Sequence, residues 1–299
     1  MSEIVLRRSI LYVPGSSQRM LEKSAALDAD GVLLDLEDAV FHTQKAEARE
    51  RVVRALHTLS FGHKETGVRI NALDTPFGRE DIEAIVPAKP SLVVLPKVNS
   101  PADVAEADLT LCKAERAASL PPGSTRLMLL IETPHGMANA FPIASSSKRI
   151  VALQYGAADF TTEMRGRITL ERTEQVYPLY HLLLAARMAR VQAIDTPYFD
   201  VRDLEGLRRH AMLAADMGYD GKAVIHPSHI EPVNQIFAPS PDEIHLCRRI
   251  VEAYEAAQAE PGRDRPPTVD GMLVEQLNYG HALRRLAIAK KAGLSESSG

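Results

Sequence analysis

The chain has 299 residues, of which 45% are hydrophobic, and it carries 35 Lys and Arg against 39 Asp and Glu. A formal net charge of -4 offers no electrostatic attraction for nucleic acid or for an acidic membrane surface. No apolar run approaches the roughly 20 residues that a membrane-spanning helix needs, and the N-terminus lacks a hydrophobic secretory segment. These features predict a cytoplasmic globular protein with no nucleic-acid or membrane partner.

Strand-like and helix-like stretches alternate along most of the chain. Short apolar runs predict strands at 9–13, 31–36, 68–71, 92–95, 127–131, 150–155, 193–196 and 222–225. Helical periodicity occurs at 17–28, 44–59, 78–85, 101–118, 137–145, 174–192 and 204–217. This alternation predicts an α/β fold, a TIM (β/α)8 barrel. A doubly wound open sheet is the alternative, although no G-x-G-x-x-G follows the first strand.

The pattern changes after Pro239-Ser240-Pro241. A helix is predicted at 242–259, followed by a polar, proline-rich link and then by a turn and a helix at 269–291. Closing a barrel does not require this appendage. We therefore predict a barrel domain over residues 1–238 and a C-terminal helical extension over 239–299. The extension is expected to contribute oligomer contacts and a lid over the active site.

Two carboxylates follow two successive predicted strands. The segment LLIETPHG ends its apolar run at Glu132, and the next strand is followed by Gly156 and Asp159. In a barrel the C-terminal strand ends build the active site, so these acids should face one place. Hard oxygen ligands without Cys or a His pair favour Mg2+, with Mn2+ as the alternative, over zinc. Ion pairs with Arg69 and Lys97 are the competing interpretation.

Other polar residues occupy the same position relative to their strands. They are Tyr12, Asp35, Glu37, Asp38, Arg69, Lys97, Asp195 and His226. One acid of LLDLEDAV could cap the following helix, and Arg69 could be a structural counter-ion for these acids. Lys97 could serve a Schiff-base aldolase, a second enzyme class. A histidine before proline, as at His226, is more often a hydrogen-bonded structural group.

Seven blocks of the sequence, taken together, resemble a known family. They are RRSILYVPGS (7–16), GVLLDLEDAV (31–40), VRINALDTPFG (68–78), LLIETPHG (129–136), YGAADF (155–160), QAIDTPYFDVRD (192–203) and GKAVIHPSHI (221–230). In this order they closely resemble the citrate lyase β-subunit-like (CitE-like) branch of the HpcH/HpaI aldolase family. The resemblance implies a TIM barrel with a C-terminal extension, dependence on Mg2+ and assembly as a homotrimer or hexamer.

The resemblance also implies roles for particular residues. Glu132 and Asp159 match the magnesium ligands, and both would contact the substrate. Arg69 matches the catalytic arginine that holds the thioester carbonyl or the enolate formed from it. Glu37 and Asp38 match acids that hold metal-bound waters.

Further positions match the substrate contacts of the family. Ala158 and Asp159 lie in the segment whose backbone amides receive the carboxylate of the oxo acid. Tyr12 and Pro14 match part of the coenzyme A contact. The expected partner is accordingly a CoA-thioester substrate, with an acyl carrier protein as an alternative carrier.

One departure from the family falls in the C-terminal extension. The family shows G-x-x-x-D, whose aspartate reaches a neighbouring active site as the acid/base, whereas residues 271–275 here end in Glu275. Glutamate keeps the carboxylate but extends it by about 1.5 Å. A misplacement of that size in a catalytic group can cost about a hundredfold in rate. Either Glu275 acts from a shifted backbone, or the substrate or reaction differs.

The residues and the resemblance together predict a Mg2+-dependent carbon–carbon lyase. Its substrates would be 3-hydroxyacyl-CoA thioesters such as malyl-CoA or citramalyl-CoA, cleaved to acetyl-CoA and a 2-oxo acid or formed in reverse. One alternative is a citrate lyase β subunit that cleaves citryl-acyl-carrier-protein. Others are a thioesterase and a non-catalytic CoA-binding relative, because the usual C-terminal Asp is Glu275.

Overall fold

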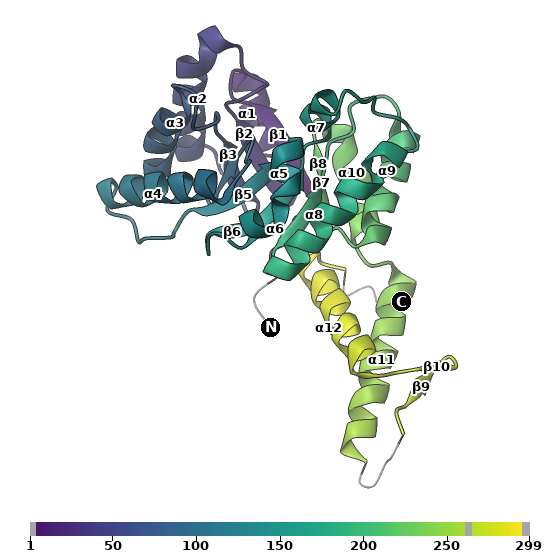
Figure 1. Ribbon diagram of the computed structural model, residues 1–299. Coiled ribbons are helices and arrows are strands. Elements are labelled where there is room, and N and C mark those ends of the chain that lie inside the picture. Colours follow the sequence, from purple (N-terminus) through teal and green to yellow (C-terminus); the bar gives the residue numbers. More distant parts are fainter. Residues whose placement is uncertain (1–3, 261–264, 295–299) are drawn as a thin grey trace. The chain divides into compact units, whose positions relative to one another are not determined.

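The computed structural model describes residues 4–260 and 265–294 (Figure 1). Two compact units divide the chain: residues 7–234 form the first, and the described parts of 1–6 and 235–299 form the second. The predicted boundary at 238/239 lies four residues beyond this division. Among the described residues, none of the helices combines the length and the apolar content needed to cross a membrane.

Eight parallel strands close into a barrel in the first unit. They are β1 (Ser9–Pro14), β2 (Gly31–Asp35), β3 (Glu65–Arg69), β4 (Leu92–Leu95), β5 (Arg126–Ile131), β6 (Ile150–Tyr155), β7 (Gln192–Asp195) and β8 (Gly221–Val224). The ring closes because β1 pairs with both β2 and β8. The predicted TIM barrel is therefore confirmed, and the open doubly wound sheet is excluded.

Helices follow the strands in chain order (Figure 1). In this unit the α-helices are α1 (Gln18–Ser24), α2 (Lys45–Thr58), α3 (Gly78–Ile85), α4 (Pro101–Ala117), α5 (Pro134–Ala138), α6 (Ala140–Ala144), α7 (Ala157–Glu163), α8 (Val176–Ala189) and α9 (Leu204–Met217), and α10 (Ile230–Phe237) contains the division between the two units. Short 3-10 turns are η1 (His42–Gln44), η2 (Val86–Ala88), η3 (Thr173–Gln175) and η4 (Pro227–His229). The sequence did not predict α7 or α10, although α10 has the same length as α3, which was predicted.

The barrel interior follows from the alternation of side chains along each strand. Inward-facing residues form one buried apolar cluster: Ile10, Tyr12, Leu33, Leu92, Val94, Met128, Leu130, Ala152, Ile194 and Ala223. Two residues further along their strands, the same inward columns reach Asp35, Glu132, Gln154 and Thr196. The apolar layers therefore end, at the C-terminal face of the barrel, in a layer of polar side chains.

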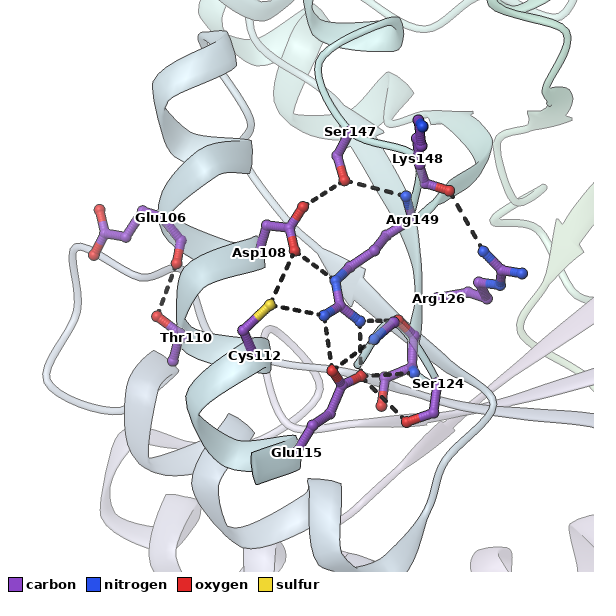
Figure 2. A network of polar contacts seen from close by, with 12 residues as sticks. Glu106, Asp108, Thr110, Cys112, Glu115, Ser124, Arg126, Ser147, Lys148 and Arg149 are labelled. Carbon is purple, nitrogen blue, oxygen red and sulfur yellow. Dashed lines mark hydrogen bonds and ion pairs between the residues drawn. The ribbon is translucent and has the colours of Figure 1, made fainter. Parts of the chain in front are cut away.

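The opposite rim of the barrel holds a separate network of buried charges around Arg149, which precedes β6 (Figure 2). The guanidinium donates through Nη1 and Nη2 to Glu115 at 2.7 and 2.8 Å and through Nε to Asp108 at 2.6 Å. Glu115 also accepts backbone N–H bonds from Thr125 and Gly123. These bonds tie α4 to the starts of β5 and β6.

The second unit is built on two helices, α11 (Pro241–Ala259) and α12 (Gln276–Lys291), and a hairpin of β9 (Thr268–Val269) and β10 (Met272–Leu273). Asp270 and Gly271 make the turn, both with positive φ (50° and 78°). Cys247 and Val274 belong to a small buried cluster shared by α11, the hairpin and α12. The unit thus has its own apolar core.

Candidate functional site

A cavity of about 370 Å³ opens at the C-terminal ends of the barrel strands. It brings together seven of the predicted site residues, which come from five different loops or strand ends: Tyr12, Pro14, Asp38, Arg69, Glu132, Ala158 and Asp159. Asp35, Gln154 and Thr196 also line this cavity. Glu37 is buried and reaches the site through its contact with Arg69.

Arg69, the last residue of β3, is held rigidly in the cavity wall. Its Nε and Nη2 donate to the two oxygens of Asp35 at 2.7 and 2.5 Å, and its Nη1 lies 3.0 Å from Glu37 Oε2. The guanidinium carbon stands 5.1 Å from the centre of the Tyr12 ring. Burial opposes the charge, but Asp35 outweighs it and raises the pKa of Arg69 well above its usual value. A permanently charged, oriented guanidinium therefore faces the cavity.

Lys97 supports the site with its backbone and its side chain. It has left-handed backbone geometry (φ 53°), and its N–H donates to Glu132 Oε1 at 2.8 Å. Its Nζ lies 3.0 Å from Glu37 Oε1. Burial lowers the pKa of this amine, but Glu37 outweighs that effect, and the net shift is upward. A protonated amine is the opposite of what a Schiff-base nucleophile needs.

Glu132 is a buried carboxylate in an environment that disfavours its charge. Burial, together with the negative charges of Glu37 and Asp159, raises its pKa well above the usual value. Gly156 makes room for this side chain, because a Cβ at that position would lie 2.3 Å from Glu132 Cβ and 2.6 Å from Oε2. The fold therefore places an uncompensated acid beside a second one.

These acids fit a divalent cation. Burial and the neighbouring Asp38 raise the pKa of Glu37, and its Oε2, although close to Arg69, has no hydrogen-bond partner. A cation held by Glu132 and Asp159 would neutralise the repulsion, and a water on that cation could donate to Glu37. Within residues 4–260 and 265–294, no group of three or more His, Cys, Asp or Glu is placed to hold a metal. A two-carboxylate site of this kind suits Mg2+, which retains several waters or substrate oxygens.

Two cavity residues, Gln154 and Thr196, were not named from the sequence, whereas Asp35 was named as one of the acids that could pair with Arg69, and the structure confirms that pairing. Asp35 orients Arg69, Gln154 accepts a 2.9 Å hydrogen bond from the Tyr12 hydroxyl, and Thr196 Oγ1 accepts from the N–H of Ala157. The alternation of side chains along each strand could have identified them as facing the barrel interior. Each lies an even number of residues beyond an inward-facing apolar residue, and Gln154 is the one polar residue in the run IVALQY.

Other polar strand-end residues do not line the cavity. Asp195 faces the opposite side of the strand from Thr196, away from the barrel interior. It is buried between Arg172 and Lys222, each 2.6 Å away. His226 is exposed and bonds to Ser228. Glu275 belongs to the second unit, where it is exposed. It is the N-cap residue of α12 and forms a capping box with Asn278.

The fold and the cavity define a class: a (β/α)8-barrel protein with a buried carboxylate centre beside a fixed guanidinium. The sequence profile of the family HpcH/HpaI aldolase/citrate lyase matches residues 8–227. The chain belongs to this family, and specifically to its CitE-like members. The predicted family resemblance is confirmed.

Individual relatives are similar over nearly the full chain. The citrate lyase subunit beta of Leuconostoc mesenteroides subsp. cremoris is 35% identical over 294 residues, 98% of this chain and 97% of that protein. A (3S)-malyl-CoA thioesterase of Cereibacter sphaeroides (strain KD131 / KCTC 12085) is 39% identical over 283 residues, 95% of this chain and 94% of that protein. One relative is named for a lyase and the other for a thioesterase, so similarity alone does not select one reaction.

Among solved structures, the CitE protein of Mycobacterium tuberculosis in complex with magnesium, acetoacetate and coenzyme A is 29% identical, with a TM-score of 0.74. The match covers 95% of this chain and 97% of that one. A citrate lyase from Burkholderia xenovorans LB400 has a TM-score of 0.84 at 23% identity, covering 98% and 94% of the two chains, and supports the fold alone.

Proposed function

We propose that the protein is a Mg2+-dependent carbon–carbon lyase that cleaves 3-hydroxyacyl-CoA thioesters, such as malyl-CoA or citramalyl-CoA, to acetyl-CoA and a 2-oxo acid. The main support for the proposal is that one cavity contains both a cluster of acids and a fixed positive charge. Glu132 and Asp159 form an uncompensated negative centre, and Arg69 supplies a fixed positive charge beside it. Cleavage of a β-hydroxy thioester needs both kinds of group.

Bond cleavage releases charge at two places. The 3-hydroxyl loses its proton as the C2–C3 bond breaks and the oxo acid forms. The electron pair passes to the thioester as an enolate, which then takes up a proton at C2. Arg69 is suited to the enolate oxygen, since Asp35 occupies only Nε and one N–H of Nη2 of its five donors. A preorganised donor of this kind typically contributes 10²–10³ in rate.

The acids of the site hold the other half of the substrate. When bound at Glu132 and Asp159, Mg2+ would lower the energy of the alkoxide that develops at the 3-hydroxyl. Glu37 and Asp38 would then accept hydrogen bonds from water bound to the ion and orient it. The backbone at Ala158 and Asp159 is the proposed contact for the oxo-acid carboxylate. Tyr12 and Pro14 remain proposed contacts on the CoA side.

Turnover is the direct test of this function. We expect the protein with Mg2+ to release acetyl-CoA and glyoxylate or pyruvate from malyl-CoA or citramalyl-CoA, and EDTA to abolish the release. The acetyl-CoA and the oxo acid should appear in equal amounts. Activity that is unchanged by EDTA, or absent with both thioesters, would refute the proposal.

The acid/base is proposed to be Glu275, supplied by another copy of the chain in a homotrimer or hexamer. Mixing Glu275→Gln with Glu132→Gln protein under exchange conditions should then restore part of the activity, because some sites regain both intact groups. Glu275→Asp, which restores the family residue but draws the carboxylate back by about 1.5 Å, should lower activity by no more than about a hundredfold, and less than Glu275→Gln does. Absence of complementation would remove the intersubunit role.

Hydrolysis is the second candidate, favoured by the 39% identity to the (3S)-malyl-CoA thioesterase. Hydrolysis of malyl-CoA would release free CoA and malate in place of acetyl-CoA and glyoxylate. Following all four products in one assay separates the two reactions. A third candidate, cleavage of citryl-acyl-carrier-protein, rests on the similarity to the citrate lyase subunit beta and predicts turnover of the protein-bound thioester alone.

A further inference from the structure

A second cavity, of about 190 Å³, adjoins the first. The two share four lining residues: Ala157, Thr196, Pro197 and Phe199. Its remaining wall comes from the segment that follows α7, including Ile168 and Leu170, from Tyr198 and Asp200 after β7, and from His210 of α9. We call this space the side pocket. The shared wall residues make the two cavities direct neighbours, as the extension of a substrate from the main cavity into the side pocket would require.

The wall of the side pocket is fixed from behind by buried charges. Arg172, which is 1% exposed, donates to Asp195 at 2.6 and 3.0 Å and to the carbonyl of His210 at 3.2 Å. Lys222 Nζ donates to Asp195 and to the carbonyl of Thr196, each at 2.6 Å. The segment carrying Leu170 is thus tied to β7, β8 and α9. The pocket is preformed and does not depend on a ligand to order it.

The side-chain polar groups of the side pocket have partners within the chain. Gln175 donates to Glu174 and accepts from Arg172, and Asp200, the one carboxylate in the pocket lining, accepts from the N–H of Arg202. His210 Nε2 bonds to the Leu170 carbonyl (3.0 Å), Thr169 Oγ1 to Glu174 (2.6 Å) and the Tyr198 hydroxyl to Asp203 (2.5 Å). Burial and the nearby positive charges lower the pKa of His210 to about 4, so its ring is neutral at pH 7. A carboxylate entering the pocket would lose water without gaining a donor, which is costly.

Apolar surface is what the side pocket offers a ligand. Ile168 and Leu170 are each 45% exposed, and Phe199 is 50% exposed. Covering such side chains with hydrocarbon is favourable by roughly 25 cal/mol per Å² of buried apolar area. The pocket therefore matches an alkyl group and not a charged one.

Position identifies which part of the substrate reaches it. The side pocket borders Ala157 and Thr196, at the ends of β6 and β7, next to Ala158 and Asp159. Arg69, the proposed thioester contact, is on β3, which β4 and β5 separate from β6. We infer that the side pocket binds the alkyl substituent of the 2-oxo acid, R in R–CO–COO⁻, and selects short-chain 2-oxo acids over glyoxylate and over oxaloacetate. This inference rests on the proposed function.

Binding tests the inference without requiring turnover. Calorimetric titration of the Mg2+-loaded full-length protein would use glyoxylate, pyruvate, 2-oxobutanoate and oxaloacetate, with R as H, CH₃, C₂H₅ and CH₂COO⁻. We expect 2-oxobutanoate to bind at least about tenfold more tightly than glyoxylate, since one methylene in an apolar pocket discriminates 10- to 200-fold. Oxaloacetate should bind more weakly than 2-oxobutanoate.

Matched variants locate the effect. Leu170→Trp fills the side pocket and should lower the affinity ratio of 2-oxobutanoate to glyoxylate at least tenfold, whereas Leu170→Ala should shift the preference to 2-oxopentanoate. Leu109→Trp, at an exposed leucine of α4, should keep the original ratio. An unchanged ratio in Leu170→Trp, tighter binding of oxaloacetate than of 2-oxobutanoate, or no binding of any acid would overturn the inference.

Condensation of acetyl-CoA with the same acids separates the inference from the proposed function. Discrimination by chain length in binding, with no condensation or cleavage, would refute the lyase and leave the pocket assignment standing. Turnover of all the acids with equal kcat/KM and equal affinity would support the lyase and refute the pocket assignment.

Discussion

Two clusters of buried charge lie at opposite ends of the barrel, and they are built differently. At the N-terminal rim, Arg149 meets two carboxylates, and Glu115 accepts bonds from this guanidinium and from two backbone N–H groups (Figure 2). Burial opposes ionisation of Glu115, but these bonds outweigh it and lower its pKa to about 2. At the C-terminal face, Glu132 accepts one bond, from Lys97, and its pKa is raised.

The number of compensating partners around a buried acid therefore distinguishes a structural acid from a functional one in this fold. Every charged group of the Arg149 cluster has ion-pair and hydrogen-bond partners within the chain, so a ligand could add little. The Glu132 cluster has more buried negative charge than its donors compensate, so it gains most from a ligand that brings positive charge. Loss of the first cluster should therefore cost stability, and loss of the second should cost function.

Arg149→Met should have the largest effect. Removing the guanidinium leaves Glu115 and Asp108 without their partner, and breaking a buried pair in this way costs about 3–5 kcal/mol of unfolding free energy. Urea unfolding measures it. Arg126→Met, which removes an exposed arginine that bonds to the Lys148 carbonyl, is the control and should change stability by less than about 0.5 kcal/mol (Figure 2). Equal stabilities of the two variants would contradict the comparison.

Glu132→Gln should show the opposite pattern from Arg149→Met: a large loss of activity with no loss of stability. We expect kcat/KM for thioester cleavage to fall by about 10²–10³, equivalent to roughly 3–4 kcal/mol. Without Mg2+, the thermal midpoint should stay the same or rise, because a repelled buried charge has been removed. Glu163→Gln, at an exposed acid of α7, is the matched control for both measurements. A large loss of stability in Glu132→Gln would class this acid with Glu115.

Mg2+ should stabilise the folded protein in a pH-dependent way. The raised pKa of Glu132 means that the folded apo protein holds this proton more tightly than the unfolded chain, whose value is near 4.5, so this acid destabilises the apo protein as pH rises. Mg2+ competes with the proton, so the thermal shift should be larger at pH 8 than at pH 6. At a hundredfold excess over Kd the gain is about 2.7 kcal/mol. An equal shift in Glu132→Gln would place the ion elsewhere.

The pH dependence of stability that Glu115 contributes has the opposite sign from that of Glu132. Its depressed pKa contributes stability that is present above the unfolded value of about 4.5 and is lost as pH falls towards about 2. Acid unfolding of the Mg2+-free protein should therefore begin in this window. In Glu115→Gln the slope of stability against pH between 4.5 and 2 should be shallower, measured by circular dichroism.

Tyr12→Phe should have the smallest effect. It removes the hydrogen bond to Gln154 but keeps the ring beside Arg69, so we expect a loss of about 1 kcal/mol in unfolding free energy and a few-fold decrease in kcat. Tyr12→Leu also removes the cation–π contact and should lower kcat further, with an added cost of about 0.5–2 kcal/mol. Equal kcat values for the two variants would show that the ring does not position Arg69.

From the sequence it was possible to predict the barrel and many, but not all, of the residues at its polar face. Apolar runs and helical periodicity report local burial, and alternation predicts a (β/α)8 barrel whose strand ends include Arg69, Glu132 and Asp159. These signals are local in the chain, so they survive without coordinates. Two short helices, α7 and α10, were not predicted.

Which of these polar residues contact one another could be seen only in the tertiary structure. Asp35, Glu37 and Lys97 are distant in sequence from Arg69 and Glu132, and their pairing depends on strands lying side by side in a closed ring. The same geometry separated Asp195 from Thr196, adjacent residues that face opposite sides of β7. Charge compensation is a sum over neighbours in space, and for that reason the chain order could not distinguish the satisfied Glu115 from the unsatisfied Glu132.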